Sequence, residues 1–371
     1  MKSMEGMISA RQLVIIIALS RIPVLGVFMP VITLADARQD AWFSAIMAVL
    51  GGIILGGLAA LLAMRFPYQS LGSSAKVSLG KYLGVGVVLI FGLYFYLLSL
   101  SRVRELSLLI VSTILPNTPG WVFGVTILIA ALYGVLLGAD TLGRSAEMLL
   151  TIVAITIFGG FILLFISGTE GISLLRPILS RGIQPVAVAA VHPSFEFANS
   201  AATVLALGKF CRRPRGMVRA VTAATLLSGV VKISLVVVVL ISLGPLEAQQ
   251  QLSPLLTVAR TVNIPGVFER IDLLLVSIWV LGVIFEVTLF FFTASVILAD
   301  GLGLTLGKTA VPLFFVGLIP VSLRFTDMFD FIQFWGPLSA GIIILTIHIF
   351  LVGLVLFVSV LRGKGGKNEN A

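Results

Sequence analysis

The sequence predicts an all-α protein that crosses the membrane many times. Of its 371 residues, 58% are hydrophobic and 11% are charged, and the mean hydropathy is +1.14. Soluble domains carry roughly 25% charged residues, so this composition excludes an ordinary soluble protein. Apolar runs recur from Leu13 to Leu361 with short polar segments between them. Each run has close to the ~20 residues that a membrane-spanning helix needs.

Polar and Pro/Gly clusters divide the chain into ten apolar segments, which predicts about ten transmembrane helices in a single domain of residues 1–371. The first run is longer than the apolar part of a signal peptide and lacks a cleavage site, so we expect it to remain as a span. Residues 362–371 are expected to form a disordered cytoplasmic tail. The expected spans are 12–35, 41–64, 82–110, 120–138, 146–168, 185–207, 217–243, 270–299, 308–324 and 332–361.

The basic residues of the loops predict how the spans are oriented. When the termini and every second loop are assigned to the cytoplasm, that side holds fifteen Lys and Arg residues and the other side holds six. Cytoplasmic loops carry an excess of Lys and Arg, so both termini are expected in the cytoplasm. Residues 209–219, KFCRRPRGMVR, contribute five of the fifteen. This rule accounts for the net charge of +9 without a nucleic-acid partner.

Two spans contain helix breakers near their middles. Span one has Pro23 and Gly26, and span six has Pro193 within AVHPSFEFANS, residues 190–200. Proline removes a backbone donor and clashes with the preceding turn, so a break at membrane depth must face protein or a watery cavity. Spans one and six are five apart. Matched interruptions at this spacing favour an inverted-repeat transporter fold, although ordinary proline kinks are the alternative.

Five short stretches, occurring in order across almost the whole chain, resemble the spore germination permeases. They are QDAW (39–42), RELSLLIVSTILPNTP (104–119), GRSAEM (143–148), LRPILSRGIQPV (175–186) and FERIDLLLVSIW (268–279). That family comprises the integral-membrane B subunits of nutrient germinant receptors. The resemblance implies a LeuT/APC-like fold with two five-helix inverted repeats, at about 8–168 and 184–325, followed by a final helix at 332–361.

The resemblance also implies a function and partners. Members of the family sense a small nutrient, such as an amino acid, together with an A subunit and a lipoprotein C subunit. We therefore expect a multi-pass protein of the cell membrane or spore inner membrane that binds its ligand at the membrane midplane. No nucleic-acid partner is expected.

The expected ligand site lies where the two broken helices expose backbone groups. Helix N-termini favour carboxylates and unwound carbonyls favour ammonium groups, so the backbone of 22–26 and 191–195 is expected to hold the ligand's ends. The candidate ligand-binding residues are Ile22, Pro23, Val24, Leu25, Gly26, His192, Ser194, Phe195, Glu196 and Trp279.

Structural roles compete with several of these assignments. Glu196 either faces a ligand amine or bonds an open helix end. His192 either titrates near neutral pH or packs beside the break, and Trp279 either walls the pocket or packs in the core. Arg21 is expected to anchor structure. An interfacial cluster near the outer end of span three is expected from Arg102, Arg104 and Glu105.

The chain departs from the family pattern at two places. Ser194 and Phe195 stand where the family usually has phenylalanine and glycine, which changes the pocket. Glu286 stands where many members have a lysine, whereas Lys232 lies in the middle of span seven. Charges at this depth are usually paired or functional, so we hypothesise an ion pair between Lys232 and Glu286.

No enzyme motif is present, because His192 and His348 are far apart in sequence, Cys211 is the single cysteine and no metal-ligand spacing occurs. We therefore expect no catalytic residue, no cofactor and no metal. Three alternatives to a receptor subunit remain open. They are a proton-coupled transporter of amino acids in which Lys232 replaces a coupling cation, a water or ion channel subunit, and a scaffold that anchors the A subunit.

Overall fold

The computed structural model describes residues 7–22, 33–113, 115–167, 171–251, 253–261, 271–322 and 337–365. Within these ranges the chain is almost entirely helical, and the one strand-like contact there is an isolated bridge between Ile8 and Cys211. The α-helices are Ala10–Leu19 (α1), Ala41–Arg65 (α3), Leu71–Leu79 (α4), Lys81–Thr113 (α5), Gly120–Leu137 (α6), Ala139–Ser167 (α7), Gln184–Ala202 (α8), Val204–Leu207 (α9), Met217–Gln250 (α10), Pro254–Thr261 (α11), Ile271–Leu302 (α12), Leu306–Ser322 (α13), Pro337–Ile343 (α15) and Val352–Leu361 (α16). The 3-10 helices are Arg38–Asp40 (η1), Ile172–Leu175 (η2), Gly208–Phe210 (η3) and Pro214–Gly216 (η4), and Ile344–Leu351 (η5) is a π-helix.

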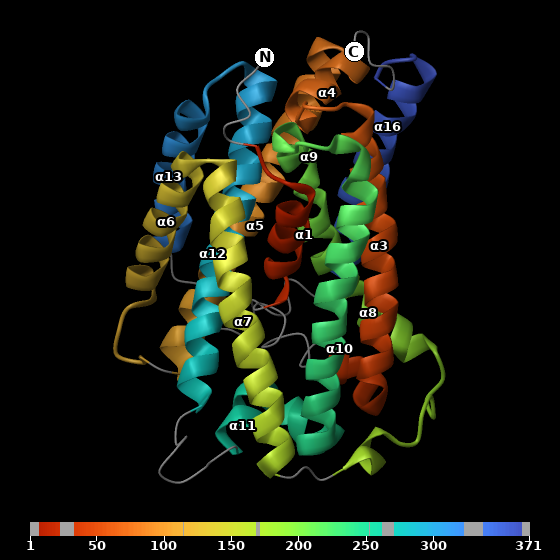
Figure 1. The fold of residues 1–371 in the computed structure, drawn as a ribbon, viewed down its shortest axis with the longest axis vertical. Helices are drawn as coiled ribbons and strands as arrows, with labels where there is room; N and C mark the ends of the chain where they lie inside the picture. The colour runs from red at the N-terminus through yellow and green to blue at the C-terminus, as the bar shows by residue number, and fades with distance from the viewer. Residues whose placement is uncertain are drawn as a thin grey trace.

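The long helices stand side by side and form a bundle (Figure 1). In the described ranges, seven helices are long and apolar enough to cross a membrane, from Thr33–Arg65 to Leu338–Leu361. Ala10–Leu19 and Leu306–Ile319 are shorter apolar helices. The predicted all-α, multi-pass fold is therefore confirmed, while the total of ten spans remains a prediction.

Helix α1 lies inside the bundle and packs against the longer helices α7, α8 and α10 (Figure 1). A capping box starts it, because the Ser9 hydroxyl accepts a hydrogen bond from Gln12 N at 3.1 Å and Gln12 Oε1 accepts one from Ser9 N at 2.9 Å. The helix ends just before Arg21, which is buried. The predicted interruption at residues 23–26 lies outside the described residues.

Helix α8 passes through Pro193 without interruption, which corrects the prediction of an unwound segment at residues 191–195. The proline removes one backbone hydrogen bond, but the turns before and after it are helical, and α8 runs to Ala202. The chain first departs from regular α-helix at Thr203, at the junction with α9. The helix breaker therefore lies inside span six as expected, but the helix does not open at that point.

Close packing against α3 supports α8 beside the proline. A Cβ on Gly51 would lie 2.5 Å from Ser194 Oγ, and a Cβ on Gly52 would lie 2.4 Å from Phe197 Cβ. Real Cβ atoms do not approach so closely, so a larger residue at either position would force Ser194, Phe197 or one of the two helices to shift. These contacts hold α8 helical where a proline alone would favour a break.

Two predicted span boundaries can be compared with the helices. Residues 139–145, which we expected to be a loop, form about the first two turns of α7. A single glycine, Gly138 with φ 87°, separates α6 from α7. In α10, Gly244 with φ 71° interrupts the helix, in agreement with the predicted end of span seven at 243. Both positions require a residue that tolerates positive φ.

Polar contacts gather the loops at one end of the bundle. Lys209 Nζ lies 2.7 Å from Asp300 Oδ1, and Ser70 Oγ donates to Asp300 Oδ2 at 2.6 Å. Arg362 Nη1 donates to Ser78 O at 3.0 Å. These contacts join four segments that the charge distribution assigned to the cytoplasmic side.

A separate group of contacts joins loops at the opposite end. Gln39 Nε2 donates to Pro177 O at 3.0 Å, and Leu179 N donates to Asp40 Oδ1 at 2.9 Å. The loops that we assigned to a common side therefore lie together. Which side faces the cytoplasm remains a prediction.

Candidate functional site

Arg21, at the end of α1, lies at the centre of a buried polar network. Its guanidinium pairs with Glu196 of α8 and with Glu286 of α12, and its Nε donates to the Ser200 hydroxyl. The Ser20 hydroxyl lies 2.8 Å from that of Ser200. Arg21 and Glu196 are each 1% exposed and Glu286 is 0% exposed. The network thus links α1, α8 and α12 in the interior of the protein.

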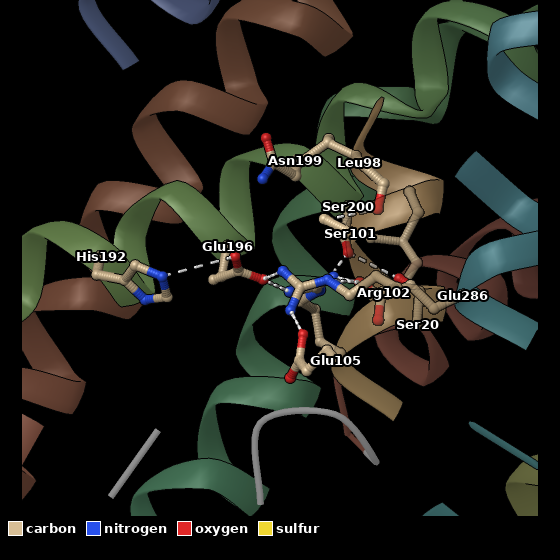
Figure 2. Close-up of polar contacts among 12 residues, drawn as sticks. Ser20, Leu98, Ser101, Arg102, Glu105, His192, Glu196, Asn199, Ser200 and Glu286 are labelled. Carbon is tan, nitrogen blue, oxygen red and sulfur yellow. Dashed lines mark hydrogen bonds and ion pairs between the residues drawn. The ribbon is translucent and has the colours of Figure 1, made fainter. Parts of the chain in front are cut away.

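Arg102 of α5 extends this network to a fourth helix. Its Nη2 donates to Glu196, its Nη1 donates to Glu105 one turn along α5, and its Nε lies 3.7 Å from Glu286 Oε1. Figure 2 shows the Arg102 guanidinium between the carboxylates of Glu196 and Glu105. His192 Nε2 lies 4.0 Å from the other Glu196 oxygen. One Glu196 oxygen is therefore shared by two guanidinium groups, while the second faces an imidazole.

These charges can be buried in the bundle because they compensate one another as ion pairs. Two arginines and three glutamates, Glu105, Glu196 and Glu286, give the network a formal net charge of −1 (two positive, three negative). Removing one partner from a buried ion pair typically costs about 3–5 kcal/mol, because the other charge is left uncompensated. The network therefore fixes how the four helices lie relative to one another.

Two sequence predictions about charged residues are corrected. Glu286 pairs with Arg21 and not with Lys232, because Arg21 approaches α12 from the end of α1. The expected interfacial cluster near the end of span three is not interfacial at Arg102 and Glu105, which are 8% and 6% exposed and belong to the central network. Their position one helical turn apart brings both side chains to the same face of α5.

The other predicted ligand residues fall into three groups. Ile22, Phe195 and Trp279 are buried in the main hydrophobic core, and their roles in ligand binding remain predictions. The Ser194 hydroxyl donates to Ala190 O at 2.7 Å within α8. Four predicted residues lie outside the described ranges, and these are Pro23, Val24, Leu25 and Gly26.

A second polar cluster, which the sequence analysis missed, lies one turn further along α8. Asn199 Oδ1 accepts a hydrogen bond from the Tyr94 hydroxyl and lies 3.0 Å from His348 Nε2. Tyr94 Oη lies 3.3 Å from the same nitrogen. Asn199 Nδ2 and His348 Nδ1 have no hydrogen-bond partner in the described part of the chain. The sequence signal was limited to single polar residues within apolar runs.

His348 lies in the π-helix η5, within the last apolar segment. Helical segments of this kind are rare and occur frequently at functional sites. The second cluster joins this segment to α5 and α8, and two of these helices also carry the central network. The two clusters together connect five helical segments through buried polar contacts.

This arrangement suits the binding of a charged or zwitterionic solute. A ligand that competed with one ion pair of the network would change the contacts among α1, α5, α8 and α12. Within the described ranges, no group of three or more His, Cys, Asp or Glu residues could hold a metal ion.

Sequence comparisons identify similar proteins across most of the chain. A family model described as spore germination protein matches residues 7–330. Spore germination protein YndE of Bacillus subtilis (strain 168) is 28% identical over 294 residues, which is 78% of this chain and 78% of that protein. Spore germination protein XB of Bacillus anthracis is 24% identical over 335 residues, which is 90% of this chain and 92% of that protein.

Two solved structures have the same fold. The crystal structure of MhsT in complex with L-phenylalanine matches with a TM-score of 0.64 at 14% identity, covering 95% of this chain and 89% of that chain. A manganese transporter mutant of Eremococcus coleocola matches with a TM-score of 0.58 at 14% identity, covering 95% and 77%. These likenesses confirm the predicted LeuT/APC-like fold class.

Proposed function

We propose, from the premise that this chain belongs to the spore germination protein family, that it is the nutrient-sensing subunit of a germinant receptor. The ligand is a small solute such as an amino acid, which binds near the middle of the membrane. Binding biases the helix bundle between two conformations, and partner subunits respond to that change. The expected partners are the A subunit and the lipoprotein C subunit of the receptor, in the spore inner membrane.

The buried network of Arg21, Arg102 and Glu196 supports this proposal. A ligand shifts a conformational equilibrium only through contacts that differ between the two states. The network joins the end of α1 to α5, α8 and α12, so a solute that altered one ion pair would act on four helices together. Charges buried at this depth in a membrane protein are usually functional or paired, and Arg21, Arg102 and Glu196 are paired with one another.

The test compares spores that have or lack this gene. Germination is scored against a panel of amino acids, nucleosides and sugars, and uptake of the same solutes is measured in growing cells. We expect spores without the gene to lose the response to one nutrient while uptake is unchanged. The lost nutrient names the ligand class.

The opposite result would assign a different function. Normal germination together with the loss of one uptake activity would make the chain a secondary transporter. A scaffold would be distinguished by Glu196→Asp, which keeps the buried charge: with the chain at normal abundance, a scaffold would leave the nutrient response unchanged and a sensor would change its sensitivity to the nutrient.

A further inference from the structure

Lys232 of α10 is a buried lysine without an ionic partner in the described part of the chain. It is 1% exposed, and its Nζ has neither a hydrogen bond nor an ion pair with any described residue. Its Nζ lies over the ring of Phe197, 3.8 Å from the ring centre. A cation over an aromatic face is stabilised, but the ring does not neutralise the charge.

The position of Lys232 relates it to the central network. Phe197 directly follows Glu196 on α8, and Lys232 interacts electrostatically with Glu196, Arg21 and Arg102. His192 of α8 also interacts with it. The lysine therefore faces the middle of α8 from α10, beside the network and outside its ion pairs.

The carboxylates of the network are already paired with arginines. Arg21 and Arg102 both bond Glu196, Arg21 pairs with Glu286, and Arg102 bonds Glu105. The network has a formal net charge of −1, so the sum with a charged Lys232 is zero. A zwitterion entering this region would preserve that neutrality, whereas a simple anion or cation would add an uncompensated charge.

We propose that Lys232 binds the carboxylate of the ligand and so restricts this site to zwitterionic amino acids. The inference rests on the proposed function, because it assumes that a solute binds within this bundle. Lys232 supplies three N–H donors for the carboxylate oxygens. The Phe197 ring limits the approach to one side of the ammonium group.

The experiment measures binding to the purified full-length chain in lipid nanodiscs. The probes are the twenty L-amino acids and, for each, the corresponding α-carboxamide, with thermal stabilisation and calorimetric titration as readouts. A charge-assisted hydrogen bond in a buried site should favour the acid over the carboxamide by about 10-fold or more. If the amino acid that binds most tightly and its α-carboxamide bind the unsubstituted protein with equal affinity, the proposal is overturned.

Three variants test whether Lys232 causes the preference for the acid over the carboxamide. Lys232→Met should reduce the ratio of acid to carboxamide affinity to near one, and Lys232→Arg should keep most of it. Arg144→Met, at an exposed position, is the matched control and should leave the ratio unchanged. A Lys232→Met protein that folds and retains the full preference would contradict the assignment.

The result separates this inference from the function on which it rests. If carboxamides bind as well as acids, the site senses nutrients but Lys232 does not select them. If no probe binds and spores without the gene still lose a nutrient response, the receptor function stands and the lysine proposal fails. If spores without the gene germinate normally, the proposed function itself fails.

Discussion

Glu196 carries more of the central network than any other carboxylate in the described chain, because it accepts from both Arg21 and Arg102. Replacing it with glutamine would leave two buried guanidinium groups facing a neutral amide. We expect Glu196→Gln to lower the free energy of unfolding by about 3 kcal/mol or more. Thermal melting of the purified protein in one detergent measures the change.

The exposed ion pair between Asp140 and Arg144 is the control for this substitution. Its side chains are 33% and 75% exposed, and such pairs contribute at most about 1 kcal/mol. Asp140→Asn should therefore change the melting temperature little. Equal losses in Glu196→Gln and Asp140→Asn would show that burial does not govern the strength of the network.

Single charged residues could be found from the sequence, but their pairing could not. Arg21 and Glu196 stand out because they interrupt apolar runs. Their partners depend on which faces of four helices meet, and this is not encoded in any local pattern. Arg102 was placed near a helix end because α5, at about 50 Å, is longer than the ~30 Å hydrocarbon layer. The pair expected for Lys232 failed because Arg21 already occupies the carboxylate of Glu286.

At the scale of helices, the contact between α3 and α8 depends on the absence of a side chain at Gly52. An added Cβ would lie 2.4 Å from Phe197 Cβ, so one helix must move. We expect Gly52→Ala to destabilise the protein by about 1–3 kcal/mol, the usual cost of overpacking. The melting temperature and the yield of folded protein measure this effect.

Gly57 provides a matched control on the same helix. Nothing lies within 4 Å of the position that its Cβ would take. Alanine is the better helix former, so Gly57→Ala should be neutral or stabilising by up to about 1 kcal/mol. A Gly52→Ala protein as stable as Gly57→Ala would show that α3 and α8 are not closely packed at this level.

The helices themselves were largely predictable, whereas their interruptions were not. Long apolar runs define where helices lie, and span seven ends at Gly244 as expected. Pro193 predicted an opening that α8 does not show, because packing against α3 opposes it. The seven residues before span five looked like a loop because they are polar, yet they continue α7 beyond its apolar part.

At the scale of the whole molecule, the sidedness of the bundle can be tested with introduced cysteines. Ser173→Cys and Lys364→Cys place exposed thiols at the two ends. A membrane-impermeant maleimide should label Ser173→Cys in intact cells, and Lys364→Cys only after permeabilisation. The reverse pattern would invert the orientation that the loop charges predict.

The native cysteine does not interfere with this labelling. Cys211 is 2% exposed, and burial raises the pKa of its thiol to about 12. The thiolate is the reactive form, so its fraction stays very small at pH 7 and grows only as the pH approaches that pKa. The unsubstituted protein is therefore expected to remain unlabelled at either face.

The π-helix Ile344–Leu351 gives the last segment a geometry that no other described helix of the bundle has. A π-turn holds one more residue than an α-turn. Closing it to α geometry would rotate α15 against α16 by about 100° and would carry His348 away from Asn199. The segment η5 can therefore act as a torsional hinge between α15 and α16. A change at Asn199 would then rotate the C-terminal helix about the helix axis.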